Sequence, residues 1–222
     1  MSEGAVSSSA GAIPPRRETR QQLDGDAAPT RAILEATEGL LATTSLKDLT
    51  VATIIEAAGV ARGTFYFYFT SKYSVLAALL RDVLTDVSAA TKAYAERGDT
   101  PPDVTLHRLM KTVVDVYSQH TALLRAASEN WHVDAELGAM YTTMTASIID
   151  SLVEQIDRER RAGLAPMIVN TRSLAAALTW MNERTLYAAA SGIDPALRLD
   201  EELADTLTAI WVGAIYGMPE SD

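Results

Sequence analysis

Residues 49–76 read LTVATIIEAAGVARGTFYFYFTSKYSVL, and this stretch decides the fold. Thr50 is expected to cap a short apolar helix, because its hydroxyl can accept a hydrogen bond from an amide of the first turn. Gly59 supplies the turn that follows, since glycine tolerates the left-handed conformation that ends many helices. Another short helix is expected from Val60 to Phe67. Two short helices joined by a glycine turn predict a helix-turn-helix.

The second helix of such a pair lies in the major groove of DNA, so its exposed side chains are candidates for reading bases. Arg62 can donate two hydrogen bonds to one guanine. Phe65 and Phe69 lie four residues apart and are expected to face the core, whereas Phe67 fits either environment. Lys72 brings positive charge to the start of the next helix, whose free amides also attract phosphate. The predicted DNA-binding residues are Thr50, Arg62, Gly63, Thr64, Tyr66, Tyr68 and Lys72.

Helical patterns continue on both sides of this motif, and an all-α fold is expected. Thr30 is the expected cap of the first helix and Ser71 that of the fourth. Breaks between later helices are expected at residues 101–102, 161–166 and 191–195, where proline and glycine accumulate. The predicted parts are a disordered arm at residues 1–28, a DNA-binding domain at 29–70, a connecting helix at 71–95 and a second helical domain at 96–222.

The arm carries a small basic cluster, Arg16, Arg17 and Arg20, in a segment without apolar periodicity. It is either a solvated tail or an arm that touches the DNA backbone or minor groove.

Composition supports a helical, soluble protein. Hydrophobic residues make up 48% of the 222 residues, but aromatic residues only 6%. The absence of cysteine excludes disulfides, and no apolar run approaches the roughly 20 residues of a membrane span. Without a signal-peptide pattern, a cytoplasmic location is expected. The net charge of −10 is uneven: residues 1–72 hold seven basic and eight acidic residues, so the DNA-binding part is nearly neutral.

One amide interrupts an apolar stripe in the helix expected at residues 171–191. Asn182 falls on the same face as Leu174, Leu178 and Leu186. A buried amide without a partner costs about 1–3 kcal/mol, so this side chain needs one. It is either hydrogen-bonded to a neighbouring helix or a polar anchor in an otherwise apolar ligand cavity.

Several motifs resemble a known family. Residues 30–76, and above all ARGTFYFYFTSKYSVL, resemble the DNA-binding domain of the TetR/AcrR family of bacterial regulators. TFYFYF followed by SK, IDRER before a Gly-x-Ala-Pro turn, MNERTLY and IWVGAIYG further resemble its EthR-like branch, the ethionamide-resistance regulators.

The resemblance implies specific roles. Tyr66, Tyr68 and Lys72 match phosphate contacts of the family, and Arg62 and Thr64 match base-reading positions. It also implies that residues 96–222 bind an effector and form the dimer, and that Asn182 contacts ligand. Thr179 stands where the branch carries a second asparagine, so the ligand need not be the same. The candidate effector-binding residues are Met110, Tyr117, Tyr141, Met144, Thr179, Asn182 and Trp211, although the methionines and aromatic residues also suit a plain core.

The resulting hypothesis is a ligand-responsive repressor that binds a palindromic operator as a homodimer, through helices at 171–191 and 200–217, and is released by a small apolar effector. No cofactor, metal or membrane partner is expected. His107, His120 and His132 lack the spacing of helical metal ligands, and no phosphate loop or serine elbow is present. The alternatives are a constitutive DNA-binding protein, which would ignore ligands, and an all-helical enzyme, which would turn over a bound molecule.

Overall fold

The computed structural model describes residues 16–166 and 169–217, with side chains from residue 28 onward. Within these ranges the regular structure is entirely helical, which confirms the expected all-α fold. The helices are α1 (Arg16–Leu41), α2 (Val51–Ala58), α3 (Arg62–Tyr68), α4 (Lys72–Ala95), α5 (Pro102–Gln119), α6 (Thr121–Asn130), α7 (Ala135–Arg161), α8 (Thr171–Ala190) and α9 (Glu201–Tyr216).

The helix-turn-helix forms as the sequence predicts. Thr50 caps α2 by accepting a 3.1 Å hydrogen bond from the amide of Thr53. Gly59 ends the helix with a φ of 65°, which is the left-handed conformation that glycine favours. The next helix, α3, begins at Arg62 rather than Val60, because Ala61 is still extended.

The first helix differs from its prediction. α1 begins at Arg16, so residues 16–28, which were expected to belong to the disordered arm, are helical. Pro29 lies inside this helix, and Thr30 is therefore not its cap. Arginine, glutamate, glutamine and leucine dominate residues 16–23, and their helix propensity favours this longer helix. Residues 1–15 lie outside the described residues.

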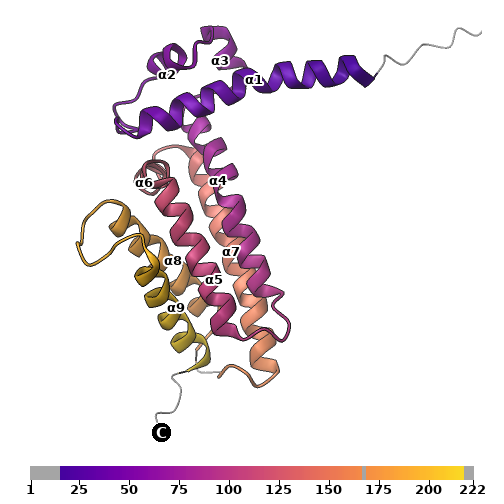
Figure 1. The fold of residues 1–222 in the computed structure, drawn as a ribbon, viewed down its shortest axis with the longest axis vertical. Helices are drawn as coiled ribbons and strands as arrows, with labels where there is room; N and C mark the ends of the chain where they lie inside the picture. The colour runs from indigo at the N-terminus through magenta and orange to yellow at the C-terminus, as the bar shows by residue number, and fades with distance from the viewer. Residues whose placement is uncertain (1–15, 167–168, 218–222) are drawn as a thin grey trace, which may run out of the picture.

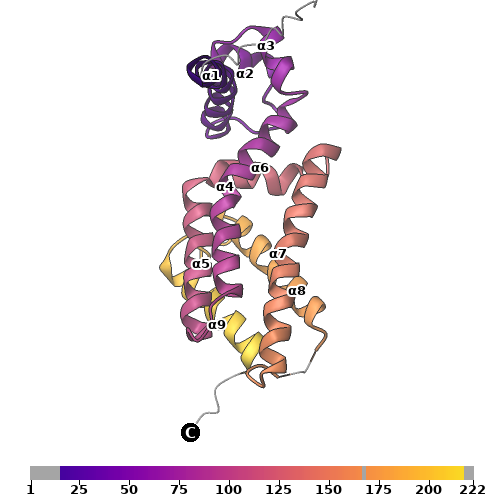
Figure 2. The ribbon, with the colours of Figure 1, turned by 90° about the vertical axis from the view of Figure 1, so that its right-hand side faces the viewer.

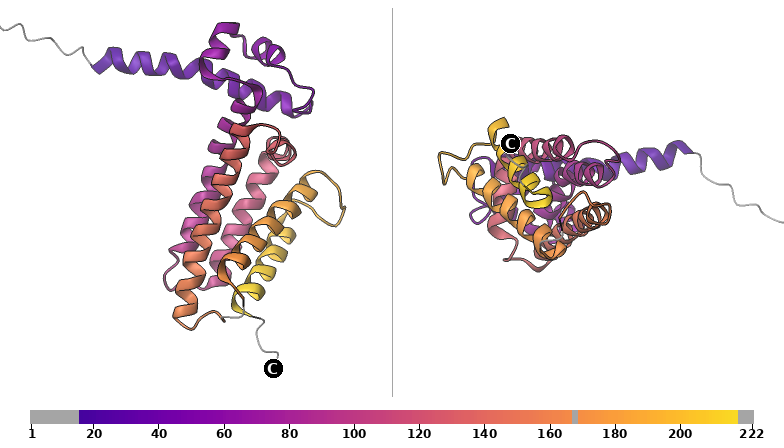
Figure 3. Two further views of the ribbon diagram at one scale, coloured as in Figure 1. Left: turned by 180° about the vertical axis from the view of Figure 1, so that it is seen from behind. Right: turned by 90° about the horizontal axis from the view of Figure 1, so that it is seen from below.

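Two bodies share the long helix α4. α1, α2 and α3 form a small unit at one end of the molecule, and α4 runs from it into a bundle with α5, α7, α8 and α9 (Figure 1). A capping box between Ser71 and Ser74 starts α4, as expected for Ser71. The short helix α6 lies across the end of the bundle nearest α1 (Figure 2), and these two helices pack against each other. Seen along the bundle, α1 projects well beyond it (Figure 3).

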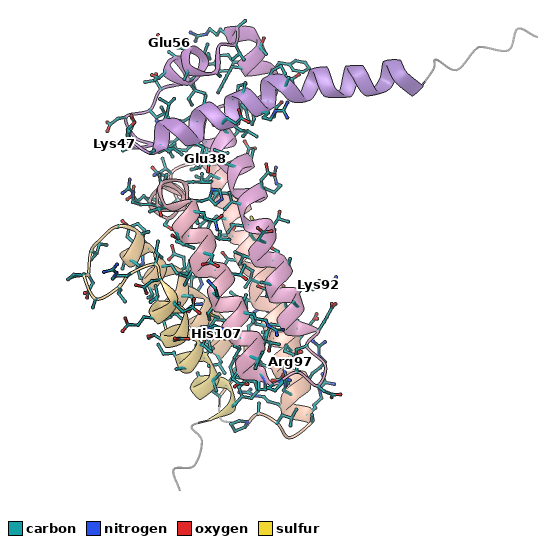
Figure 4. All side chains as sticks on the ribbon, in the orientation of Figure 1. Glu38, Lys47, Glu56, Lys92, Arg97 and His107 are labelled. Atoms are coloured by element: carbon teal, nitrogen blue, oxygen red, sulfur yellow. The ribbon has the colours of Figure 1, made fainter. Side chains whose placement is uncertain are left out.

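A buried polar network closes the opposite end of the bundle, near Arg97 in Figure 4. The Nε of Arg97 donates a 2.7 Å hydrogen bond to Glu159 of α7, and both side chains are more than nine-tenths buried. Tyr216 of α9 donates to the same carboxylate, and its hydroxyl lies 2.9 Å from that of Tyr94 on α4. Burial is the main cause that raises the pKa of both tyrosines, so both stay protonated. α4, α7 and α9 are thus held together at this end.

Candidate DNA-binding face and ligand cavity

The recognition helix α3 is anchored by two phenylalanines. Phe65 is fully buried and Phe69 nearly so, as their spacing predicts. Arg62, Gly63 and Tyr66 are exposed, whereas Thr64 and Tyr68 are half-buried. Phe67 is 79% exposed, which the sequence left undecided. An apolar ring on this surface can contact the methyl group of thymine, so Phe67 joins the candidate DNA-binding residues.

The exposed side of α3 is arranged around its first turn. The guanidinium of Arg62 lies 5.5 Å from the ring centre of Tyr66, which can hold it in place by a cation–π contact. A Cβ added to Gly63 would meet no atom within 4 Å. Nothing in the part of the chain that the structure describes requires glycine there, and close approach of a partner would explain it. Thr50 is exposed, but its hydroxyl is already engaged in capping α2.

Lys72 has a different setting from the one expected for a phosphate contact. Its Nζ donates to the backbone carbonyls of Leu46, Lys47 and Leu49 at 2.7, 3.2 and 2.8 Å. An ammonium group has three donors, so none remains free for phosphate. Desolvation lowers the pKa of this amine, and the negative charge of the nearby Asp48 partly offsets that shift by raising the pKa. As placed, Lys72 joins the start of α4 to the turn between α1 and α2.

The bundle encloses an apolar cavity of about 120 Å³. Most of its wall is aliphatic or aromatic, and its lining includes residues of α4, α5, α6, α7, α8 and α9. The seven residues that sequence reasoning proposed for effector binding all line it: Met110, Tyr117, Tyr141, Met144, Thr179, Asn182 and Trp211.

Asn182 makes hydrogen bonds to two other helices while facing this cavity. Its Oδ1 accepts a 2.9 Å bond from the indole Nε1 of Trp211 on α9. Its Nδ2 lies 3.2 Å from the sulfur of Met110 on α5, a weak acceptor. The amide is thus paired with neighbouring helices and also lies in the cavity wall, while its contact with a ligand stays a prediction.

Sequence reasoning missed several polar wall residues. Ser128 of α6, Trp180 and Glu183 of α8 also line the cavity, and the hydroxyl of Tyr141 donates a 3.1 Å hydrogen bond to Glu183. The sequence does hint at Glu183, because it directly follows Asn182 in MNERTLY. A glutamate next to an arginine, here Arg184, is however typical of a solvated helix face.

Two helices of the cavity wall, α4 and α6, are tied to the DNA-binding unit, which is the small unit formed by α1, α2 and α3. α4 contributes Leu80, Leu84, Val87 and Thr91 to the cavity, and its first residue is Lys72. α6 contributes Leu124, Ala127 and Ser128. Just before α6, the Nδ1 of His120 lies 2.7 Å from Oε1 of Glu38 on α1, which is labelled in Figure 4. A change in cavity shape can therefore reach α1 through both helices.

The outer faces of α8 and α9 carry exposed apolar side chains. Trp180 is 40% exposed and Ile210 42% exposed, and Ala177, Ala209 and Ala214 are exposed too. Ala175, which is also small and lies on α8, is fully buried.

His107 takes a polar role near the surface. The Nε2 of His107 (Figure 4) lies 3.0 Å from Asp205 and 3.4 Å from Glu201, while Lys111 forms an ion pair with Glu201 at 3.3 Å. A lysine already supplies positive charge to this exposed group, so ion pairing explains the arrangement.

Among the helices that the structure describes, none has an apolar stretch sufficient to cross a bilayer.

A helix-turn-helix mounted by one long helix on a cavity-bearing helical bundle defines the class of helix-turn-helix transcriptional regulators. Comparison with known proteins agrees. Residues 33–79 match the family model of bacterial regulatory proteins of the tetR family, and residues 106–217 match the C-terminal domain of the transcriptional regulator EthR. The chain belongs to the TetR family of bacterial transcriptional regulators, and within it is EthR-like.

Relatives cover most of the chain. It is 36% identical over 190 residues to the HTH-type transcriptional regulator EthR of Mycobacterium tuberculosis, covering 84% of this chain and 86% of that protein. The EthR of Mycolicibacterium smegmatis is 31% identical, with coverage of 84% and 85%. Among solved structures, a TetR-family regulator from Syntrophomonas wolfei superposes with a TM-score of 0.71 at 17% identity, covering 87% and 98%. The fatty acid degradation regulator FadR of Bacillus halodurans superposes with a TM-score of 0.66 at 19% sequence identity. This alignment covers 82% of this chain and 97% of that chain.

Proposed function

We propose that this regulator is a repressor that binds a palindromic operator as a homodimer and leaves it when a small, largely apolar effector fills the cavity. The observation that carries the proposal is the double role of α4 and α6. Both helices line the cavity, and both are bonded to the DNA-binding unit, through Lys72 and through His120.

The mechanism is a change in spacing. Two recognition helices of a dimer must reach successive major grooves, about 34–36 Å apart for half-sites one turn apart. An effector that fits one arrangement of α4 and α6 better than the other shifts the dimer toward that arrangement. Because such coupling is reciprocal, operator DNA must weaken effector binding by the same factor.

The dimer is proposed to form through the outer faces of α8 and α9. Ala177, Ala209 and Ala214 are small, so partner helices can approach closely, and Trp180 and Ile210 add apolar area. Homodimers with two-fold symmetry bury the same patch on both subunits, which fits one apolar face per protomer. A four-helix bundle built from two copies of α8 and α9 satisfies this geometry.

The test begins with DNA selected from a random duplex pool by the full-length protein. Small apolar molecules that raise the melting temperature of the protein are then added to its complex with the selected duplex. Ligands that stabilise the protein are expected to lower its DNA affinity, measured by fluorescence anisotropy. Ligands that stabilise it without changing DNA affinity would identify a constitutive DNA-binding protein instead.

The link through α6 can be tested separately. His120→Ala removes the contact with Glu38 and is expected to reduce the effect of ligand on DNA affinity, while leaving ligand affinity nearly unchanged. His132→Ala, an exposed histidine just beyond α6, is the matched control. Equal ligand responses in the two variants would exclude His120 as a link.

A further inference from the structure

A single carboxylate faces the otherwise apolar cavity. Among the lining residues that the structure describes, Glu183 alone is an Asp, Glu, Lys, Arg or His. Its side chain is only 14% exposed. It belongs to α8 and follows Asn182, so its place in the wall is fixed by the same helix.

This carboxylate is only partly compensated. Its Oε1 accepts the hydrogen bond of Tyr141, and its Oε2 lies 3.8 Å from the guanidinium of Arg184. That guanidinium is 64% exposed and also lies 4.9 Å from the ring centre of Tyr187. Because the guanidinium is mostly in solvent and 3.8 Å away, it contributes little, and the charge facing the cavity is largely unmatched.

A second polar atom nearby, the Oγ of Ser128, has hydrogen-bonding capacity left. Ser128 is more than nine-tenths buried and lines the cavity. Its Oγ lies near the hydroxyls of Tyr117 and Tyr141 and favours their ionised forms, but it forms no hydrogen bond of good geometry among the described residues. A buried hydroxyl is normally paired, so this one has unused capacity to accept a hydrogen bond from a ligand.

Aromatic faces complete this end of the cavity. The ring of Tyr141 is stacked on Trp131 at 5.7 Å and lies 6.4 Å from Trp180. Gly138 permits this packing, because a Cβ there would come within 2.7 Å of the Trp131 carbonyl oxygen. Burial, and then the charge of Glu183, raises the pKa of Tyr117, so its hydroxyl remains neutral and does not repel or neutralise a ligand.

We infer that the cavity binds an apolar molecule that ends in a protonated amine, with the ammonium group between Glu183, Ser128 and the ring of Tyr141. The inference rests on the proposed effector function and names the chemical class of the effector. The ammonium group pairs with the carboxylate, donates to Ser128 Oγ and meets aromatic faces, which attract cations. The aliphatic wall of α4 and α5 covers the apolar body. A carboxylate ligand would instead bring like charges together in a poorly solvated space.

Three probes that differ only in their end group test this class: 4-phenylbutylamine, 4-phenylbutan-1-ol and 4-phenylbutyrate. Calorimetric titration of the full-length protein is expected to show the amine binding about tenfold or more tighter than the alcohol, with the acid weakest. An alcohol that binds as tightly as the amine overturns the inference, as does the absence of binding by all three probes. Neither result contradicts the proposed release of DNA by an effector, because that release is tested separately by fluorescence anisotropy.

A matched pair of variants assigns the preference to this site. Glu183→Gln keeps the hydrogen bond with Tyr141 and removes the charge, so it is expected to weaken amine binding about tenfold and alcohol binding by less than about twofold. Glu129→Gln removes an exposed carboxylate from α6, outside the cavity lining, and is expected to change neither. If both variants bind the amine like the parent, Glu183 does not recognise it and the inference fails. The comparison of probes on the parent protein needs no variant to fold.

Discussion

The indole Nε1 of Trp211 donates a 2.9 Å hydrogen bond to Oδ1 of Asn182, and this bond joins α9 to α8 at the wall of the cavity. Both side chains are buried. The amide that interrupts an apolar stripe therefore has a structural partner, and the partner itself lines the cavity.

Asn182→Leu is expected to lower the free energy of unfolding by about 1–3 kcal/mol, because the indole N–H of Trp211 is left buried without an acceptor. The same change would be neutral or stabilising only if the amide had no partner. Chemical denaturation of Asn182→Leu, Trp211→Phe and the double variant measures the coupling, expected at about 0.5–3 kcal/mol. Additive effects of the two changes would contradict the bond.

Arg62→Ala is expected to relax the base preference at one position of each half-site, losing about 1–3 kcal/mol of discrimination. Arg62 is exposed on α3 and its guanidinium lies over Tyr66, so it is placed to meet a base edge. Binding to a set of single-base variants of the selected duplex gives the preference. Unchanged discrimination at every position would show that Arg62 does not read bases.

Gly63→Ala separates folding from DNA binding. Alanine has room at this helical position, so the protein should gain about 0.5–1 kcal/mol of stability. If Gly63 permits close approach of DNA, affinity should fall about tenfold, which corresponds to a loss near 1.4 kcal/mol. Gly39→Ala in α1 is the matched control, with equal space around its Cβ, and should leave affinity unchanged. Equal DNA affinity of both variants would remove Gly63 from the interface.

Lys72→Met tests the role that the structure gives to this lysine. The carbonyls of Leu46 and Leu49 lose a charged donor, so the free energy of unfolding should fall by about 1–3 kcal/mol. The salt dependence of DNA binding should stay nearly unchanged. A phosphate contact would instead appear as a salt slope lowered by about one unit, with stability preserved.

Ile210→Arg tests the proposed dimer. Ile210 is 42% exposed on α9, and a charge introduced there would be desolvated by a partner helix. Sedimentation is expected to show dissociation to the monomer, accompanied by loss of operator affinity. Thr142→Arg, on the exposed side of α7, is the control and should remain dimeric. A dimeric Ile210→Arg protein would move the interface elsewhere.

Much of the fold and of the candidate site follows from local sequence chemistry. Thr50, Gly59 and Ser71 delimit helices through caps and a left-handed turn, which depend on neighbouring residues only. Phe65 and Phe69 reveal the buried side of α3 through their spacing. The predicted start of the first helix at Thr30 is wrong. Residues 16–28 lack apolar periodicity, which favours a disordered arm, but their helix propensity is high enough to extend α1 to Arg16.

The sequence by itself determined the all-helical class, the helix-turn-helix and the residues suited to a cavity, because periodicity, capping and motif spacing are local properties. Only the tertiary structure decided what these residues contact. It bonded Lys72 to carbonyls 23–26 residues away, paired Asn182 with Trp211, and turned Glu183 toward the apolar interior. Such partners depend on how the helices pack against one another, and no pattern within a single helix encodes which side chain of another helix will lie opposite.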